Sequence, residues 1–316
     1  MSIRCANRTV CVATVVVAVV GTVAMLSGCS SPTPSPSGFA VVATTTQVTD
    51  FTTQIVGSAG SVTGIISANQ SAHSFDPSAK VLLEMAHADA LVINGLGIEP
   101  WLNGAIEASG FHGTIIDASA GIDTVANDPH VWTSVTNAEK MVATITAGLV
   151  KADPSQAKTF EINSAAYETK LVALNTWAQN DIDQIPAKDR LLVTNHDALA
   201  YFVRDFGVTF VGSIIPSFDD NAEPSAAEID RLVAEIKASG AKAVFSESTI
   251  SPKLAQTIAA EAGVKVYSGE DALYADTLGP VGSSGQTYID ATVHNVRILV
   301  TAWGGTNIPL PKELTS

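Results

Sequence analysis

Four side chains that could bind one metal ion follow predicted strands or lie in predicted loops. They are three histidines and one aspartate: His73, His130, His196 and Asp276. In open α/β sheets, ligands gather at the carboxyl ends of the strands, so these side chains could converge between two lobes. Three imidazole nitrogens and one carboxylate suit a tetrahedral zinc ion. Because the four residues are far apart in the sequence, their spacing alone also fits hydrogen-bonded loop residues that bind no metal.

The other three histidines are interpreted as structural. His87 and His294 fall within predicted helices, and His112 lies in a predicted glycine-containing surface turn. None of the three directly follows a predicted strand, so none is expected at the sheet edge where the four candidate ligands lie. They are therefore left out of the predicted metal site.

Two carboxylates are candidates for orienting the metal-binding histidines. A ligating imidazole usually donates its other N–H to a carboxylate or a carbonyl. Asp128 lies two residues before His130, and Glu247 follows the predicted strand Ala243–Phe245. The alternative is that Asp128 caps an ordinary loop and that Glu247 is a solvated carboxylate.

The first part of the chain alternates strands with helices. Apolar, β-branched runs predict strands, and periodic runs between them predict helices. The predicted strands are Phe39–Thr46, Ser61–Ile66, Ala90–Asn94 and Thr114–Asp117, and the predicted helices are Val48–Val56 and Pro77–His87. Such alternation implies parallel pairing, with helices on both faces of the sheet.

One long helix is predicted between Pro154 and Ile185. The segment has no glycine and no internal proline, and its apolar residues recur at three- and four-residue spacing. Because this length exceeds that of a usual globular helix, the segment is interpreted as a connector between two lobes.

The same alternation returns after this helix. The predicted strands are Arg190–Thr194, Phe210–Ile214, Ala243–Phe245 and Val264–Tyr267, and the predicted helices are His196–Phe206, Ser225–Ala238, Pro252–Ala262 and Thr287–Trp303. The predicted fold class is therefore α/β, with two parallel-sheet lobes joined by one long helix and a metal site in the cleft between them. The predicted limits are 39–150 for the N-terminal lobe, 151–188 for the linking helix and 189–316 for the C-terminal lobe.

Residues 1–28 are predicted to form a lipoprotein signal peptide. Arg4 and Arg8 precede an uncharged apolar run, Val10–Leu26, and Leu26-Ser-Gly-Cys29 ends the pattern. A basic segment, an apolar segment and a small-residue cleavage site mark such a peptide. Cys29 is therefore the predicted lipidation site, and the serine- and proline-rich residues 29–38 are a predicted extended tether. A transmembrane anchor is the alternative, although the apolar core is short against the ~20 residues that a bilayer requires.

Charge and cysteine content exclude several kinds of function. Without Arg4 and Arg8, 15 Lys+Arg stand against 31 Asp+Glu, a net charge of −16. This balance argues against a nucleic-acid partner, which needs clustered basic side chains, and it suits attraction of small cations. Two of the three cysteines, Cys5 and Cys11, lie in the predicted signal peptide, and the third is the lipidation site. No cysteine remains for a disulfide or a thiolate metal site.

Several short motifs occur in a characteristic order. They are NGLGIEPWL at Asn94–Leu102, DPHVW at Asp128–Trp132, TNHDALAYF at Thr194–Phe202, EPS at Glu223–Ser225 and LYADTLG at Leu273–Gly279. With them the chain resembles, from about Phe39 to Trp303, the zinc/manganese solute-binding lipoproteins of ABC transporters, which include the zinc-uptake binding proteins. The resemblance implies two α/β lobes bridged by one long helix. It also implies that the four residues named at the outset are the metal ligands.

The choice of metal depends on His196. Manganese-specific relatives tend to carry glutamate there, and imidazole suits Zn²⁺ better than Mn²⁺, which prefers oxygen ligands. Three histidines therefore favour zinc, with manganese or mixed use as the alternative. Two departures from the family pattern remove no ligand: the loop Ala118–Asn127 lacks the histidines of many zinc-specific relatives, and the sequence after His73 differs from the usual one.

The predicted function is capture of Zn²⁺ outside the cytoplasm and its delivery to a cognate ABC permease. The protein is predicted to be a lipid-anchored monomer on the extracytoplasmic face of the cell membrane, and not an enzyme. The less favoured alternatives are an exported zinc hydrolase and an adhesin. A zinc hydrolase keeps an open position for water, whereas Asp276 would fill the fourth position, and the chain has no His-Glu-x-x-His motif.

Overall fold

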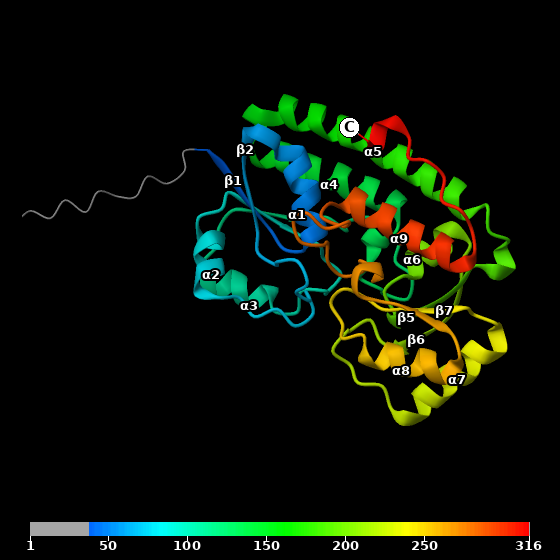
Figure 1. The fold of residues 1–316 in the computed structure, drawn as a ribbon. Helices are drawn as coiled ribbons and strands as arrows, with labels where there is room; N and C mark the ends of the chain where they lie inside the picture. The colour runs from blue at the N-terminus through cyan, green and yellow to red at the C-terminus, as the bar shows by residue number, and fades with distance from the viewer. Residues whose placement is uncertain (1–37, 316) are drawn as a thin grey trace, which may run out of the picture. The chain divides into compact units, whose positions relative to one another are not determined.

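The computed structural model describes residues 38–315 (Figure 1). The predicted signal peptide, the lipidation site Cys29 and all of the predicted tether except Gly38 lie outside the described residues. The order of strands and helices confirms the α/β class, and all the paired strands are parallel. The lobe limits given above remain a prediction.

The first sheet has four strands in the order β2-β1-β3-β4. They are β1 (Phe39–Ala43), β2 (Gly60–Gly64), β3 (Ala90–Ile93) and β4 (Thr114–Asp117). The central strands β1 and β3 are apolar and buried, as parallel strands covered on both faces require. After β3 the chain turns through Gly95, Leu96 and Gly97, which all have positive φ. A Cβ atom on Gly95 would lie 2.2 Å from Asp117 Oδ1, so this turn needs glycine.

Four helices belong to this part of the chain: α1 (Thr46–Val56), α2 (Ala79–Ala86), α3 (Leu102–Ser109) and α4 (Val135–Ala152). Helices α3 and α4 were missing from the sequence-based prediction. The signal for α4 was present, because its buried residues recur at helical spacing and Ser134 caps it by accepting a hydrogen bond from the Asn137 N–H. α3 is short and contains Gly104, which weakens its helical pattern.

The long predicted helix is present as α5 (Ala157–Ile182). It begins three residues later than predicted because Pro154–Gln156 forms a separate 3-10 turn, and Asp153 accepts a hydrogen bond from the Ser155 N–H there. Helix α5 packs against α1, α4 and α9 and buries Leu171 and Leu174. It is thus part of the core as well as a connection along the chain.

The second part of the chain has two pairs of parallel strands. They are β5 (Leu191–His196) with β6 (Thr209–Ile215), and β7 (Ala243–Phe245) with β8 (Lys265–Tyr267). β7 lies beside β5, so the two pairs are neighbours. The helices are α6 (Ala200–Phe206), α7 (Ala226–Ser239) and α8 (Lys253–Ala262). Helix α7 begins with a capping box, in which Ser225 and Glu228 are bonded reciprocally.

Helix α9 (Tyr288–Trp303) ends the regular structure and lies close to α1 and α5 (Figure 1). Helix α9 follows the second set of strands in the sequence. It nevertheless packs on α1, which belongs to the first part of the chain, and on α5, which links the two parts. One apolar cluster accordingly runs from β1 through α5 to α9, and it includes Val42, Leu171 and Val300. A second, smaller cluster fills the space between β5, β6, α7 and α8. The four metal-site candidates lie on a frame joined by continuous apolar packing.

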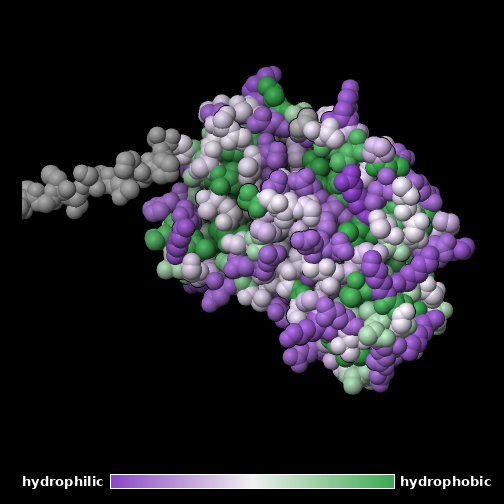
Figure 2. All heavy atoms as spheres, in the orientation of Figure 1, coloured by the Kyte–Doolittle hydropathy of each residue, from purple (hydrophilic) through white to green (hydrophobic). Residues whose placement is uncertain are grey.

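The surface seen in Figure 2 is mostly hydrophilic, with apolar residues scattered between polar ones. Exposed large apolar side chains such as Leu83, Val172 and Val281 come from separate elements of the chain. Among the described residues, no helix combines the length and the apolar character that crossing a bilayer would require.

Candidate metal centre

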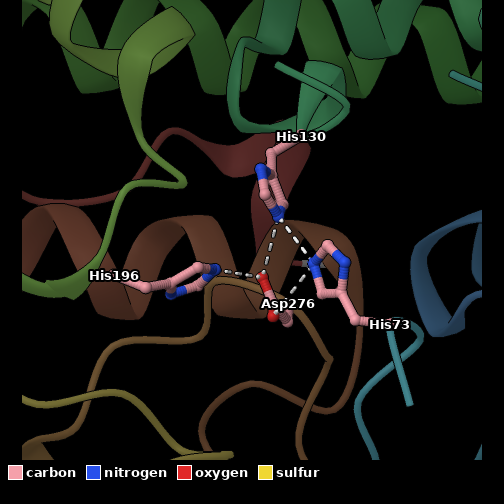
Figure 3. Close-up of side chains that lie close together, drawn as sticks. All are labelled: His73, His130, His196 and Asp276. Carbon is pink, nitrogen blue, oxygen red and sulfur yellow. Dashed lines mark hydrogen bonds and ion pairs between the residues drawn. The ribbon is translucent and has the colours of Figure 1, made fainter. Parts of the chain in front are cut away.

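The structure brings the four predicted side chains together (Figure 3). Each offers one ligand atom, and these atoms all lie within 4.8 Å of one another. Nε2 of His130 lies 3.2 Å from Nε2 of His73 and 3.4 Å from Asp276 Oδ1. Nε2 of His196 lies 3.2 Å from the same carboxylate oxygen. Three Nε2 atoms and one carboxylate therefore point at a common centre.

Different segments, from before and after α5, deliver these side chains. His73 lies in the loop between β2 and α2, and His130 directly precedes the 3-10 turn Val131–Thr133. His196 is the last residue of β5, not the first of a helix as predicted, because α6 begins only at Ala200. Asp276 lies in the loop after β8. A strand end and three loops thus meet at one point, as the carboxyl ends of parallel strands allow.

The centre is buried. The side chains of His130, His196 and Asp276 are fully buried, and that of His73 is 9% exposed. Among the described residues, the oxygens of Asp276 and Nε2 of His196 have no partner outside the four side chains of the centre. Buried polar atoms that are poorly paired are costly. A metal ion at the centre would satisfy all four side chains.

Burial and mutual attraction set the protonation of the centre. Burial alone would raise the pKa of Asp276, but His196, His130 and His73 outweigh it, so the pKa lies well below its usual range. Burial, with repulsion from His130 and His196, lowers the pKa of His73 despite the attraction of Asp276. A carboxylate and a neutral imidazole are the forms that bind metal.

His196 differs from His73 because two carboxylates face it. Burial would lower its pKa, but Glu247 and Asp276 together raise it well above the ordinary value. Without metal, a proton on this imidazole balances part of the buried negative charge. A metal ion would replace that proton, so metal binding at this site is expected to release protons.

The two carboxylates proposed to orient histidines lie against the Nδ1 atoms. Asp128 Oδ1 lies 2.6 Å from Nδ1 of His130 and also accepts that residue's backbone N–H at 2.9 Å. Glu247 Oε2 lies 2.6 Å from Nδ1 of His196, while its Oε1 accepts the backbone N–H of His196 at 3.0 Å. Glu247 is only 2% exposed, so the alternative of a solvated carboxylate is wrong. Each imidazole is left with Nε2 free to bind metal.

The remaining histidines lie away from the centre. His87 was predicted within a helix but is the C-cap of α2, one residue past its end, and His112 is exposed after α3. His294 lies within α9, where both ring nitrogens have hydrogen-bond partners, Ser284 Oγ and the carbonyl of Ala272. Their interpretation as structural residues fits these positions.

Sequence reasoning missed the segment after β6, residues 216–222, which lies beside the centre. The ring of Phe218 lies 6.5 Å from that of His130, and Asp220 Oδ1 accepts a hydrogen bond from Ser71 Oγ at 2.9 Å. Ser71 precedes His73 by two residues, so this bond ties the His73 loop to the segment after β6. The polar sequence of that segment predicted only a loop, and nothing in it indicated the contact.

The sequence matches a family model and several curated proteins. The family described as "Zinc-uptake complex component A periplasmic" matches residues 41–302. The manganese-binding lipoprotein MntA of Halalkalibacterium halodurans is 31% identical over 270 residues, which are 84% of this chain and 88% of that protein. The high-affinity zinc uptake system protein ZnuA of Bacillus subtilis is 31% identical over 245 residues, 71% of this chain and 76% of that protein.

The fold matches solved structures of the same kind. The periplasmic zinc-binding protein TroA of Treponema pallidum superposes with a TM-score of 0.78 at 25% identity, over 84% of this chain and 99% of that one. The Cd-bound periplasmic metal-binding protein of Candidatus Liberibacter asiaticus gives 0.76 at 25% identity, with the same coverage. Since the family model spans most of the chain and the fold agrees, the chain belongs to the family of periplasmic zinc-uptake complex component A proteins.

Proposed function

We propose that this protein captures Zn²⁺ outside the cytoplasm and delivers it to an ABC permease. The observation that carries the proposal is the buried convergence of three Nε2 atoms and one carboxylate whose oxygens have no other partner among the described residues. His73, His130, His196 and Asp276 are the proposed ligands. Asp128 and Glu247 are proposed to orient His130 and His196 through their Nδ1 atoms.

The spacing of the ligand atoms fits zinc. Zn–N and Zn–O bonds of about 2.0–2.1 Å place neighbouring ligand atoms of a tetrahedron about 3.3 Å apart. Three of the contacts measure 3.2, 3.4 and 3.2 Å, His73 Nε2 lies 3.9 Å from Asp276 Oδ2, and all the ligand atoms lie within 4.8 Å of one another. The nitrogen-rich set also favours zinc over manganese. Manganese is the alternative, since one relative is named a manganese-binding lipoprotein.

A binding role suits the centre better than catalysis. A catalytic zinc keeps a coordination position open for water or substrate. Here four protein ligands are available, and three of the four side chains are fully buried. Family membership also points to transport. We therefore infer that the protein is not an enzyme and that neither a hydrolase nor an adhesin describes its main role.

Replacing His130 by Ala tests the metal site. The variant should lose orders of magnitude in Zn²⁺ affinity, because it removes one of the four proposed ligands. Isothermal titration of apo protein against Zn²⁺ in competition with a chelator gives affinity and stoichiometry, and circular dichroism checks the fold. His294→Ala, a change at a histidine outside the centre, is the matched control. Unchanged binding in the His130 variant would refute the assignment.

We also propose attachment to the membrane through a lipid on Cys29 and action as a monomer. The motif before Cys29 supports the anchor, and relatives are named lipoproteins. Cys29→Ser should move the protein from the membrane fraction to the soluble fraction of expressing cells, because it removes the thiol that carries the lipid. Immunoblots of both fractions measure this. Retention of the serine variant in the membrane fraction would contradict the lipid anchor.

A further inference from the structure

All four tryptophans of the chain donate their indole N–H to a backbone carbonyl. The acceptors are Ala72 for Trp101, Ala275 for Trp132, Ile308 for Trp177 and Leu191 for Trp303. Two of these four carbonyls belong to the residue directly before a proposed metal ligand. Ala72 precedes His73, and Ala275 precedes Asp276.

Trp101 holds the loop that carries His73 from two sides. Its Nε1–H donates to the Ala72 carbonyl at 2.9 Å, and its ring packs edge-on against Phe75, with ring centres 4.9 Å apart. His73 lies between these two contacts in the sequence. Trp101 itself is the N-cap residue of α3, so the loop is fastened to a helix end and not to another loop.

Trp132 holds the segment that carries Asp276. Its Nε1–H donates to the Ala275 carbonyl at 2.9 Å, and Gln47 donates to the same oxygen at 3.3 Å. The Trp132 ring lies edge-on to His130, with ring centres 5.3 Å apart. Tyr288 in α9 donates to the Trp132 carbonyl at 2.7 Å. Trp132 is thus fixed at both its backbone and its ring, and it links two ligands of the centre.

These contacts complement the carboxylates. His130 and His196 each have a carboxylate against Nδ1, whereas among the described residues no carboxylate lies within hydrogen-bond distance of Nδ1 of His73. Within the described part of the chain, the oxygens of Asp276 contact only the three histidines of the centre. His73 and Asp276 are therefore the two ligands that no described side chain outside the centre holds, and they are the two whose preceding carbonyl accepts an indole N–H. Carboxylates thus hold His130 and His196, and indole hydrogen bonds hold the backbone next to His73 and Asp276.

We propose that Trp101 and Trp132 are positioning residues that set the orientation of His73 and Asp276 through the carbonyls of Ala72 and Ala275. The inference rests on the proposed metal-binding function. A peptide whose carbonyl is held in one direction fixes the backbone from which the next side chain projects. Metal affinity depends on such orientation by groups outside the ligands themselves. Neither tryptophan would contact the metal.

Tryptophan-to-phenylalanine variants test the proposal, since phenylalanine keeps an aromatic ring but has no N–H. Trp101→Phe and Trp132→Phe should each weaken Zn²⁺ binding by about three- to tenfold, the loss expected for one net hydrogen bond. Trp303→Phe is the matched control, because it removes an indole bond of the same 2.9 Å length, to Leu191 at the other end of β5 from His196. Co²⁺ absorption spectra should change in the two site variants and stay unchanged in the control.

Double variants separate positioning from general stability. Once His73 is replaced by Ala, Trp101→Phe should have no further effect on the residual Co²⁺ affinity, and Trp132→Phe should likewise add nothing to Asp276→Ala. Additive losses, equal losses in Trp303→Phe, or site variants with unchanged affinity and spectrum would overturn the proposal. Trp132 is buried and Trp101 is half-buried. If circular dichroism shows that Trp132→Phe does not fold, the affinity and spectrum of Trp101→Phe alone decide whether the proposal stands. Absence of Zn²⁺ binding by the unaltered protein would refute the proposed function instead.

Discussion

Two carboxylates of similar function contact their histidines in different ways. Asp128 uses one oxygen, Oδ1, for both the ring Nδ1 and the backbone N–H of His130. Glu247 uses Oε2 for the ring of His196 and Oε1 for its backbone N–H. An amide has one acceptor oxygen and one donor nitrogen. Asn at 128 can therefore still accept both hydrogen bonds, whereas Gln at 247 cannot.

This difference predicts unequal effects of two isosteric substitutions. Glu247→Gln should lower Zn²⁺ affinity by about 10–100-fold, the usual cost of losing a group that orients a metal-binding histidine. Asp128→Asn should cost clearly less, since only the charge is lost. Chelator-competition titrations of the two purified variants, side by side with the unaltered protein, measure the ratio. An Asp128→Asn loss as large as that of Glu247→Gln would show that charge and not acceptor geometry matters.

Selectivity is predicted to depend on the ligand at 196. His196→Glu exchanges an imidazole for an oxygen donor, which suits Mn²⁺ better than Zn²⁺. The ratio of Zn²⁺ affinity to Mn²⁺ affinity should therefore fall. His196→Gln, which offers a neutral oxygen of similar reach, shows how much of the change comes from charge. A ratio that stays at the value of the unaltered protein would place the determinant of selectivity elsewhere.

The residue scale is where the sequence was most informative. Short motifs contain three of the four proposed ligands, His130, His196 and Asp276, and the candidate carboxylate Asp128. His73 and Glu247 lie outside these motifs and were proposed from their positions after predicted strands. The distances between the ligands were not predictable, since they depend on how three loops fold over a strand end. The bond from Ser71 to Asp220 illustrates this limit. It joins residues 149 positions apart, and neither local sequence has a pattern that indicates the other.

At the scale of elements, several buried strands and the start of the last helix were predicted well. β7 and β4 have the predicted bounds, and α9 begins one residue after its predicted start because Thr287 is the N-cap. The packing of α9 on α1 and α5 was not predictable, because an amphipathic pattern shows which face is buried but not against which partner. The assignment of α9 to a separate C-terminal lobe came from sequence order alone.

A half-buried carboxylate joins these three helices. Asp50 of α1 accepts hydrogen bonds from the backbone N–H of Tyr288, at the start of α9, and from the hydroxyl of Tyr167 in α5. Burial raises the pKa of Asp50 more than these hydrogen bonds lower it. The ionised form is thus less favourable in the folded protein than in the unfolded chain. An asparagine oxygen can accept the same two bonds without a charge.

Asp50→Asn is therefore predicted to stabilise the fold in a pH-dependent way. With a folded-state pKa above the unfolded value, the stability of the unaltered protein is full below the ordinary pKa of aspartate and is lost as pH rises through the raised pKa. The variant should melt at a higher temperature at neutral pH, and the gain should vanish at about pH 4, near the ordinary pKa of aspartate. Thermal melts across pH measure this, with Asp230→Asn on the exposed face of α7 as control. A gain independent of pH would contradict the explanation.

At the scale of the whole described unit, both sets of strands share one packed frame. Helix α5 contacts α1, α4 and α9, and the larger apolar cluster includes residues of β1 and of β7, such as Val42 and Phe245. Hydrogen bonds from Trp132 and Gln47 to Ala275 cross from the first part of the chain to the second. Rotation about a hinge would have to break these contacts together.

This packing predicts that metal binding changes the shape of the molecule little. Capture and release should involve local movement of the loop that carries His73. Of the four proposed ligands, only His73 has a partly exposed side chain. The hydrogen bond from Ser71 to Asp220 joins this loop to the segment after β6. Small-angle scattering of apo and zinc-loaded protein should give the same radius of gyration within error. Hydrogen exchange should slow on zinc binding around residues 67–78 and 216–222 but not in α5. A marked decrease in the radius of gyration on loading would instead indicate closure of two lobes about a hinge, which a continuous core joined by α5 does not allow.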